Sequence, residues 1–100
     1  MSVSKYTRAA KGQDCQVRIP GVCNFNPETT VFAHLGGGGM GYKKRDIFGA
    51  FACSACHDAV DKRKGHYGKE DWTRAEVKLM HYEGMERTQN LLIEMGILIL

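Results

Sequence analysis

The stretch "FACSACHDAVD", residues 51–61, contains two cysteines, one histidine and two aspartates in eleven positions. The spacing Cys53-x-x-Cys56 lets a tight turn offer two thiolates to one metal ion. Cys15 and Cys23 form a second pair, at the ends of a loop that contains a turn-forming Pro-Gly dipeptide. Because these pairs account for every cysteine of the chain, we predict that the four residues bind a structural zinc ion.

Two alternatives to zinc exist for these cysteines: buried thiols without a metal, and a redox-active CxxC. The redox interpretation requires thioredoxin-like βαβ surroundings. The residues around Cys53 predict a strand before the motif but not that βαβ pattern, so metal binding is favoured.

The chain has 100 residues, of which 43% are hydrophobic and 25% are charged, as in an ordinary folded globular protein. We expect a single domain over residues 1–100. A core of this size provides little net stability, and metal binding contributes folding free energy when the site forms only in the folded chain. A zinc site would therefore stabilise the domain.

The apolar runs are short. The longest, "GILIL" at 96–100, falls far below the roughly 20 residues of a membrane span, and "MSVSKYTRAAKGQD" at 1–14 lacks the apolar segment of a secretory signal. We therefore expect a cytoplasmic protein without a membrane partner, in which reduced thiols are available to a metal. The apolar tail is expected either to pair with a second copy, giving a homodimer, or to close the core.

Two strands are predicted before the helix that carries the CxxC histidine. "TTVFAHL" (29–35) is rich in strand-forming residues and predicts a strand that ends near His34. After a glycine-rich loop, "IFGAFA" (47–52) predicts a second strand that leads directly into the CxxC. Residues 15–66 thus form the expected zinc and metal-binding region.

Helices are predicted on both sides of this region and within it. The polar lead-in, 1–14, allows one short helical turn, and "HDAVDKRK" (57–64) predicts a helix that ends at the following glycine. "TRAE" (73–76) is a capping-box pattern that begins the most regular helix, over 72–96. Its expected core-facing residues recur at spacings of three and four: Val77, Met80, Gly84, Thr88, Leu91 and Met95.

Histidines and an aspartate could form a second site. His57 and Asp61 stand at i and i+4 and share one helix face, and a strand pair packed on that helix would bring His34 close to them. Imidazole and carboxylate ligands suit Mg²⁺, Mn²⁺, Ni²⁺ or Zn²⁺, and a histidine that titrates near neutral pH can deprotonate a water for attack on phosphorus. This is the chemistry of a nuclease, although each histidine could instead be an ordinary surface or hydrogen-bonded residue.

A family resemblance points the same way. "AHL", a glycine-rich loop, an apolar strand and "CSACH" with its helix resemble the HNH endonucleases, whose ββα-metal motif is a small α+β fold. In addition, "CQVRIPGVCN", "NPETT", "ACSACHD" and "EGMERTQ" resemble the YbcO-type nucleases of prophages, over roughly residues 5–96. The resemblance implies a zinc-stabilised HNH-like domain with a C-terminal packing helix, and a metal-dependent endonuclease that hydrolyses DNA.

Carried onto this chain, the resemblance makes His34 the general base, and His57 and Asp61 ligands of the catalytic metal. Two positions differ from the HNH pattern. Ala33 stands where many HNH enzymes have a metal ligand just before the base. The middle asparagine is also missing, and Asp46, at the start of the second predicted strand, is the nearest polar candidate. His66 could replace the missing ligand.

Basic residues flank this region, and the net charge is +3. We expect them to contact DNA phosphates, which positions the nucleic acid without reading its sequence. The alternative function is a noncatalytic zinc-bound module that binds DNA or a phage recombination or replication protein. The predicted phosphate-binding residues are Lys43, Lys44, Arg45, Lys62, Arg63 and Lys64.

Overall fold

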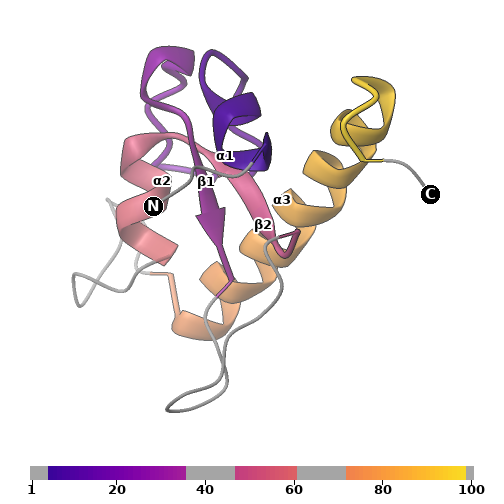
Figure 1. The fold of residues 1–100 in the computed structure, drawn as a ribbon. Helices are drawn as coiled ribbons and strands as arrows, with labels where there is room; N and C mark the ends of the chain where they lie inside the picture. The colour runs from indigo at the N-terminus through magenta and orange to yellow at the C-terminus, as the bar shows by residue number, and fades with distance from the viewer. Residues whose placement is uncertain (1–4, 36–46, 61–71, 99–100) are drawn as a thin grey trace, which may run out of the picture.

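The computed structural model describes residues 5–35, 47–60 and 72–98 of the chain (Figure 1). Within these ranges it is a small α+β structure with one two-stranded antiparallel sheet and three α-helices. The elements, in chain order, are α1 (Lys5–Ala10), the 3₁₀ turn η1 (Pro27–Thr29), β1 (Val31–His34), β2 (Gly49–Ala52), α2 (Ser54–Val60) and α3 (Arg74–Glu94).

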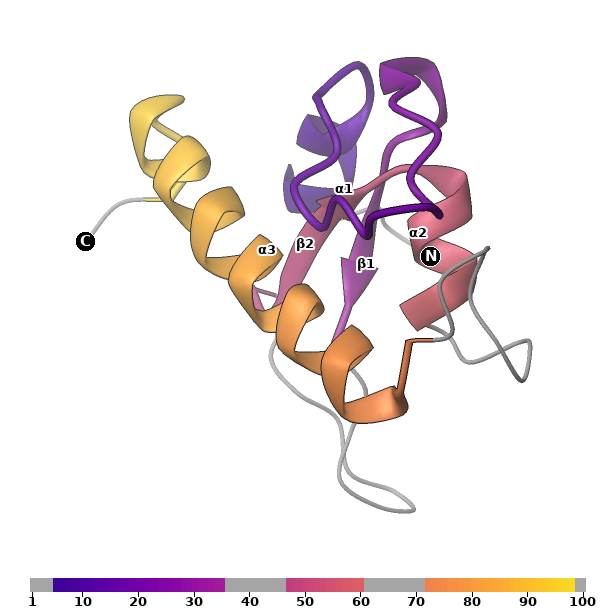
Figure 2. The same cartoon turned by 180° about the vertical axis from the view of Figure 1, so that it is seen from behind.

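The two predicted strands are confirmed. β1 and β2 pair antiparallel, with Val31 opposite Ala52 and His34 opposite Gly49. The predicted helix after the CxxC is also present, but it begins at Ser54, within the CxxC itself. In both views α3 runs beside β2, whereas α2 lies on the side of β1 (Figures 1 and 2).

Each face of the sheet packs against a different group of buried side chains. Because successive strand residues point to opposite faces, Ala33 faces α2 and the cysteines, while Phe32 faces α1. The first group includes Ala33, Ala50, Ala52, Cys53, Cys56, Ala59 and Val77. The second contains Ala10, Phe32, Phe51 and Leu92, with Tyr6, Ile97 and Leu98 packed against it. Part of the apolar tail therefore closes the core.

Helix α3 begins with the predicted capping box. The Thr73 hydroxyl accepts a hydrogen bond from the Glu76 backbone N–H at 3.1 Å, and the Thr73 N–H donates to the Glu76 carboxylate at 2.9 Å. These two bonds satisfy backbone donors that the first turn of a helix leaves without partners. The capping box therefore sets where the helix starts.

The predicted core face of α3 is partly wrong. The buried residues are Val77, His81, Gly84, Thr88 and Leu92. Met95 is 42% exposed because it is the last residue before Gly96, whose φ of 76° ends the helix. The buried stripe includes two polar residues because each forms a hydrogen bond with the sheet backbone. The His81 Nε2–H donates to the Ala33 carbonyl at 2.8 Å, and the Thr88 hydroxyl accepts from the Phe51 N–H.

The outer edge of β2 is covered by a loop and a helix side chain. The Phe51 N–H donates to the Thr88 hydroxyl at 2.9 Å, and the Phe51 carbonyl accepts from the Gln16 N–H at 2.7 Å. The Gln16 carbonyl in turn accepts from the Arg87 guanidinium, at 3.0 Å from Nε and 2.5 Å from Nη2. The backbone of Gln16 is therefore fixed between β2 and α3.

No helix within the described ranges is both long and apolar enough to cross a membrane.

Gly84 is required where α3 approaches this loop. A Cβ at Gly84 would lie 3.0 Å from the Gln16 carbonyl oxygen and 3.0 Å from Val17 Cα. Both contacts are with backbone atoms, which cannot move away as a flexible side chain can. A larger residue at this position would push α3 and this loop apart.

We predict that Gly84→Ala lowers the free energy of unfolding by on the order of 1 kcal/mol. Overpacking costs about 1–3 kcal/mol, which exceeds the gain of about 1 kcal/mol in helix propensity. Urea unfolding followed by circular dichroism measures the difference, and Asn90→Ala, at an exposed position of the same helix, is the control. A Gly84→Ala protein as stable as the wild type would contradict the close approach.

Thr88→Val should also destabilise the fold, by about 1–3 kcal/mol, because it leaves the Phe51 N–H buried without its acceptor. Thr88→Ser keeps the hydroxyl and should retain more stability than the valine variant. Thermal unfolding of the three proteins under one condition measures both differences. If serine and valine destabilise equally, the hydroxyl is not what holds this strand edge.

Candidate functional site

The four cysteines gather at one point. Their Sγ atoms all lie within 4.8 Å of one another, all four are free thiols, and three of them are buried. The Sγ atoms of Cys23 and Cys53 are 3.7 Å apart, close to the edge of about 3.8 Å of a sulfur tetrahedron around an ion with bonds of about 2.3 Å. The geometry and the donor atoms fit a tetrahedral metal ion.

Hydrogen bonds of the surrounding backbone hold the first pair of cysteines in place. Cys15 is next to Gln16, whose backbone is fixed between β2 and α3. Cys23 ends a tight turn in which the Ile19 carbonyl accepts from the N–H groups of Val22 and Cys23 at 3.0 and 2.9 Å. Gly21 allows this turn because its φ is 79°.

The second pair lies at the junction of β2 and α2. Cys53 directly follows the strand, and Cys56 lies in the first turn of the helix. This turn is tied to the loop before β1, because the Asn24 side-chain amide donates to the Ser54 hydroxyl at 3.0 Å and the Ser54 N–H donates to the Thr29 hydroxyl at 3.2 Å. No sequence pattern predicts these polar residues, although Asn24 directly follows Cys23 and Ser54 directly follows Cys53.

Backbone N–H groups point at the sulfurs. The Arg18 N–H donates to Cys15 Sγ, and the N–H groups of Cys56 and Asn24 donate to Cys53 Sγ, each at 3.4 Å. Hydrogen bonds of this kind stabilise the thiolate form of a cysteine. The cluster is thus arranged for charged sulfur, which is the form that binds a metal.

Without a metal, the cysteines of the cluster differ in their pKa. The hydrogen bond from the Cys56 thiol lowers the pKa of Cys15 to about 4. The same hydrogen bond, together with burial, raises the pKa of Cys56. Burial also raises the pKa of Cys23 to about 12. At neutral pH a metal ion must therefore displace protons from Cys23 and Cys56.

The two predicted active-site histidines lie on neighbouring elements. His34 is the exposed last residue of β1, and its ring forms a T-shaped contact with the Phe32 ring, with the centroids 5.0 Å apart. His57 is half-buried on α2, which packs against β1. Between them in sequence, Gly49 lies beneath the Phe32 ring, where a Cβ would come to 2.5 Å of Cε2. The hairpin is therefore closely packed beside His34.

Several predicted site residues lie outside the described residues, so their predictions are not tested. These are Asp61 and His66, together with the basic residues Lys43, Lys44, Arg45, Lys62, Arg63 and Lys64. Within the ranges that the structure describes, the cysteine cluster is the one group of three or more His, Cys, Asp or Glu residues with metal-binding spacing.

Comparison with known proteins identifies the family. A family model described as "Putative nuclease YbcO" matches residues 4–97. The chain belongs to the YbcO family. Relatives named "Putative nuclease YbcO" from Escherichia coli (strain K12) and from Enterobacteria phage 82 are each 47% identical over 94 residues, covering 91% of this chain and 93% of the relative.

A solved structure agrees with this assignment. It is described as "a putative bacteriophage protein" from Escherichia coli, shares 43% sequence identity, covers 90% of this chain and 98% of its own, and has a TM-score of 0.75. The predicted resemblance to YbcO-type proteins is therefore confirmed, and the family's name describes a nuclease.

We predict that the metal affinity of the cysteine cluster increases with pH between about 6 and 8, because Cys23 and Cys56 must lose protons to bind. Competition with a chromophoric chelator at several pH values measures this affinity, with the chelator's own protonation corrected. A pH-independent affinity would contradict the proton displacement. Cys53→Ser should weaken binding at every pH, whereas Ser54→Ala, which leaves the sulfurs in place, should retain most of it.

Proposed function

We propose that this member of the YbcO family is a metal-dependent endonuclease of the HNH type that hydrolyses phosphodiester bonds of DNA. The observation that carries the proposal is the β1–β2–α2 unit, in which an antiparallel hairpin is followed directly by a helix. This unit carries His34 at the end of β1, on the same face of the sheet as Phe32, and His57 on α2. The nuclease name of the family supports the same function.

Zinc is the metal that we assign to the four cysteines. Four thiolates suit Zn²⁺ in a closed structural site, because they compensate its charge and leave no open position for a substrate. The site would fasten the loop of Cys15 and Cys23 to the start of α2. Its role is therefore to hold the hairpin and helix in place, separate from any catalytic ion.

In the proposed reaction His34 removes a proton from a water, whose oxygen attacks the phosphorus atom as the bond to the leaving oxygen breaks. Exposure of His34 at the strand end gives it access to a substrate, and the Phe32 ring fixes its orientation. His57 and Asp61 would hold a divalent ion such as Mg²⁺, Mn²⁺, Ni²⁺ or Zn²⁺, with His66 as a candidate further ligand. Such an ion, when bound, stabilises the negative charge that develops on the phosphate.

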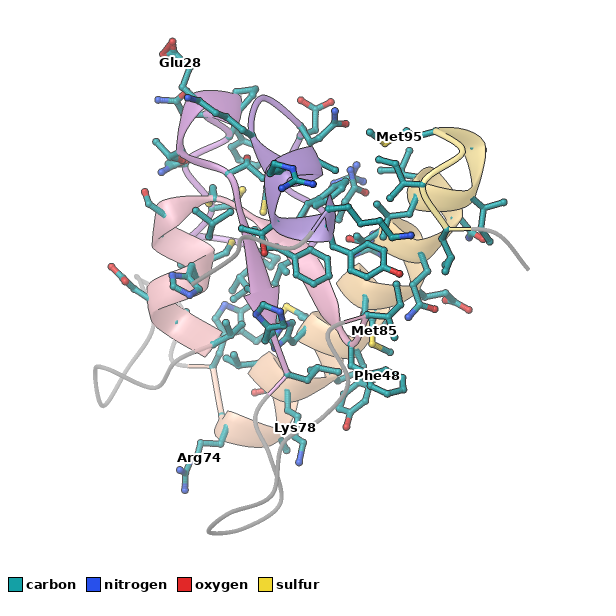
Figure 3. The ribbon with its side chains drawn as sticks, viewed as in Figure 1. Glu28, Phe48, Arg74, Lys78, Met85 and Met95 are labelled. Atoms are coloured by element: carbon teal, nitrogen blue, oxygen red, sulfur yellow. The ribbon has the colours of Figure 1, made fainter. Side chains whose placement is uncertain are left out.

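Positive charge near this end of the sheet supports DNA as the substrate. Arg74 and Lys78 are exposed at i and i+4 in the first turns of α3 and project from the same end of the molecule (Figure 3). The His34 end of β1 points toward this end in Figures 1 and 2. Together with the basic residues at 43–45 and 62–64, they would neutralise phosphates beside the scissile bond.

One observation favours the alternative, a noncatalytic zinc-bound module that binds DNA or a phage recombination or replication protein. Ala33, at the position before His34, is 1% exposed, and its carbonyl accepts the hydrogen bond from His81. This position supplies no metal ligand. In the alternative, the histidines have no catalytic role.

The decisive test is cleavage of supercoiled plasmid by zinc-loaded protein with Mg²⁺, Mn²⁺ or Ni²⁺ added singly. We expect cleavage that requires the added metal, and a His34→Ala rate lower by about 10²–10⁴-fold, the usual contribution of a general base. Asn90→Ala, on the surface of α3, is the control and should cleave like the wild type.

Zinc content and circular dichroism establish that the variants are folded. A His34→Ala protein with full activity would remove His34 from the mechanism. Absence of cleavage with every metal, in protein that binds DNA, would favour the noncatalytic module.

A further inference from the structure

Phe25 is exposed on the loop that follows Cys23 of the cysteine cluster. Its side chain is 75% exposed, more than any other large hydrophobic residue among the described ones. Its φ is 54°, in the left-handed region that bulky side chains rarely adopt. Exposure of so large an apolar side chain gains nothing from hydrophobic burial, so packing does not account for the ring.

Neighbouring hydrogen bonds maintain this conformation. The Asn24 N–H donates to Cys53 Sγ at 3.4 Å, and the Asn26 N–H donates to the Asn24 side-chain oxygen at 2.9 Å. The backbone on both sides of Phe25 is therefore held in place, on one side by Cys53 of the metal site.

Arg18 is held in a similar way on the facing segment. Its φ is also 54°, and among the described residues Arg18 and Phe25 are the two non-glycine residues with positive φ. The guanidinium donates to the Cys15 carbonyl at 2.9 Å and to the Gln16 side-chain oxygen at 3.3 Å. These bonds use two of its five N–H groups and fix its plane.

Both residues line one open hollow of about 360 Å³, together with Asp14 and Cys15. This volume is at the lower end of small-molecule sites, which suits one nucleotide rather than a larger group. Backbone strain concentrates at ligand-binding sites, where the surrounding structure can maintain it. That both strained residues line the same hollow indicates a binding site there.

The residues that line the hollow indicate which class of ligand it binds. An aromatic ring and an arginine plane are the groups on which unpaired nucleobases stack. The Asp14 carboxylate would repel a phosphate but accepts a hydrogen bond from a base amino group, such as N4 of cytosine. We propose that Phe25 and Arg18 form a stacking platform for an unpaired nucleobase of a nucleic acid. This inference rests on the proposed nuclease function, and it means that the nuclease's substrate contains unpaired nucleotides.

The platform is separate from the proposed catalytic residue. It lies in the loop before β1, whereas His34 is the last residue of that strand. Glu28, which follows Phe25 in the chain, lies at the opposite end of the molecule from Arg74 and Lys78 (Figure 3). A base on the platform would therefore belong to a nucleotide other than those at the scissile bond.

The test measures binding of the zinc-loaded full chain to a fluorescein-labelled single-stranded oligodeoxycytidine, by fluorescence anisotropy at fixed salt, beside an abasic strand of equal length. Phe25→Ala should raise the Kd for the oligodeoxycytidine roughly fivefold to hundredfold, the usual effect of losing one base-stacking residue. It should leave the Kd for the abasic strand unchanged. Phe25→Trp should restore tight binding, and Leu79→Ala, which removes an exposed side chain of α3, should have no effect.

Phe25→Gly tests whether folding causes the loss, because glycine tolerates the positive φ and relieves the strain. It should be folded and zinc-loaded, and should bind as weakly as the alanine variant. The platform would be overturned if Phe25→Ala bound the oligodeoxycytidine as tightly as the wild type, or if it bound both strands equally weakly. If the wild type still cleaved plasmid, the proposed nuclease function would nevertheless stand. A wild-type protein that binds neither strand and cleaves no plasmid would overturn both.

Discussion

The closeness of four sulfur atoms constrains the rest of this small structure. Cys15 and Cys23 come from a loop, and Cys53 and Cys56 from the β2–α2 junction, yet their Sγ atoms lie within 4.8 Å of one another. Buried, negatively charged sulfurs at this spacing repel each other unless a cation or protons compensate them. A metal ion removes this repulsion and makes the cluster a cross-link between two distant parts of the chain.

The other contacts extend this cross-link across the sheet. The Gln16 backbone, next to Cys15, bonds to β2 on one side and to Arg87 of α3 on the other. Thr88 of the same helix bonds to β2, and His81 bonds to β1. The cysteine loop, the hairpin and α3 are therefore one connected unit.

The sequence predicted what depends on local patterns. The CxxC spacing, the strand composition of 29–35 and 47–52, and the capping box at Thr73 all act over a few residues, and each appears in the structure. The buried face of α3 was predicted less well, because His81 is buried to satisfy a strand carbonyl distant in sequence. The platform was missed for a similar reason, since no pattern of residue types reveals a positive φ at Arg18 or Phe25. The catalytic roles of His34, His57 and Asp61 stay predictions.

The cross-link depends on the metal, so it is tested most directly by X-ray absorption at the zinc edge of the zinc-loaded full chain. We predict a first shell of four sulfur atoms at about 2.3 Å, with no nitrogen or oxygen ligand. Such a shell would assign all four cysteines to one closed structural site and reserve His57 for a separate ion. A mixed shell containing imidazole nitrogen would contradict this division, because the histidines would then belong to the zinc site.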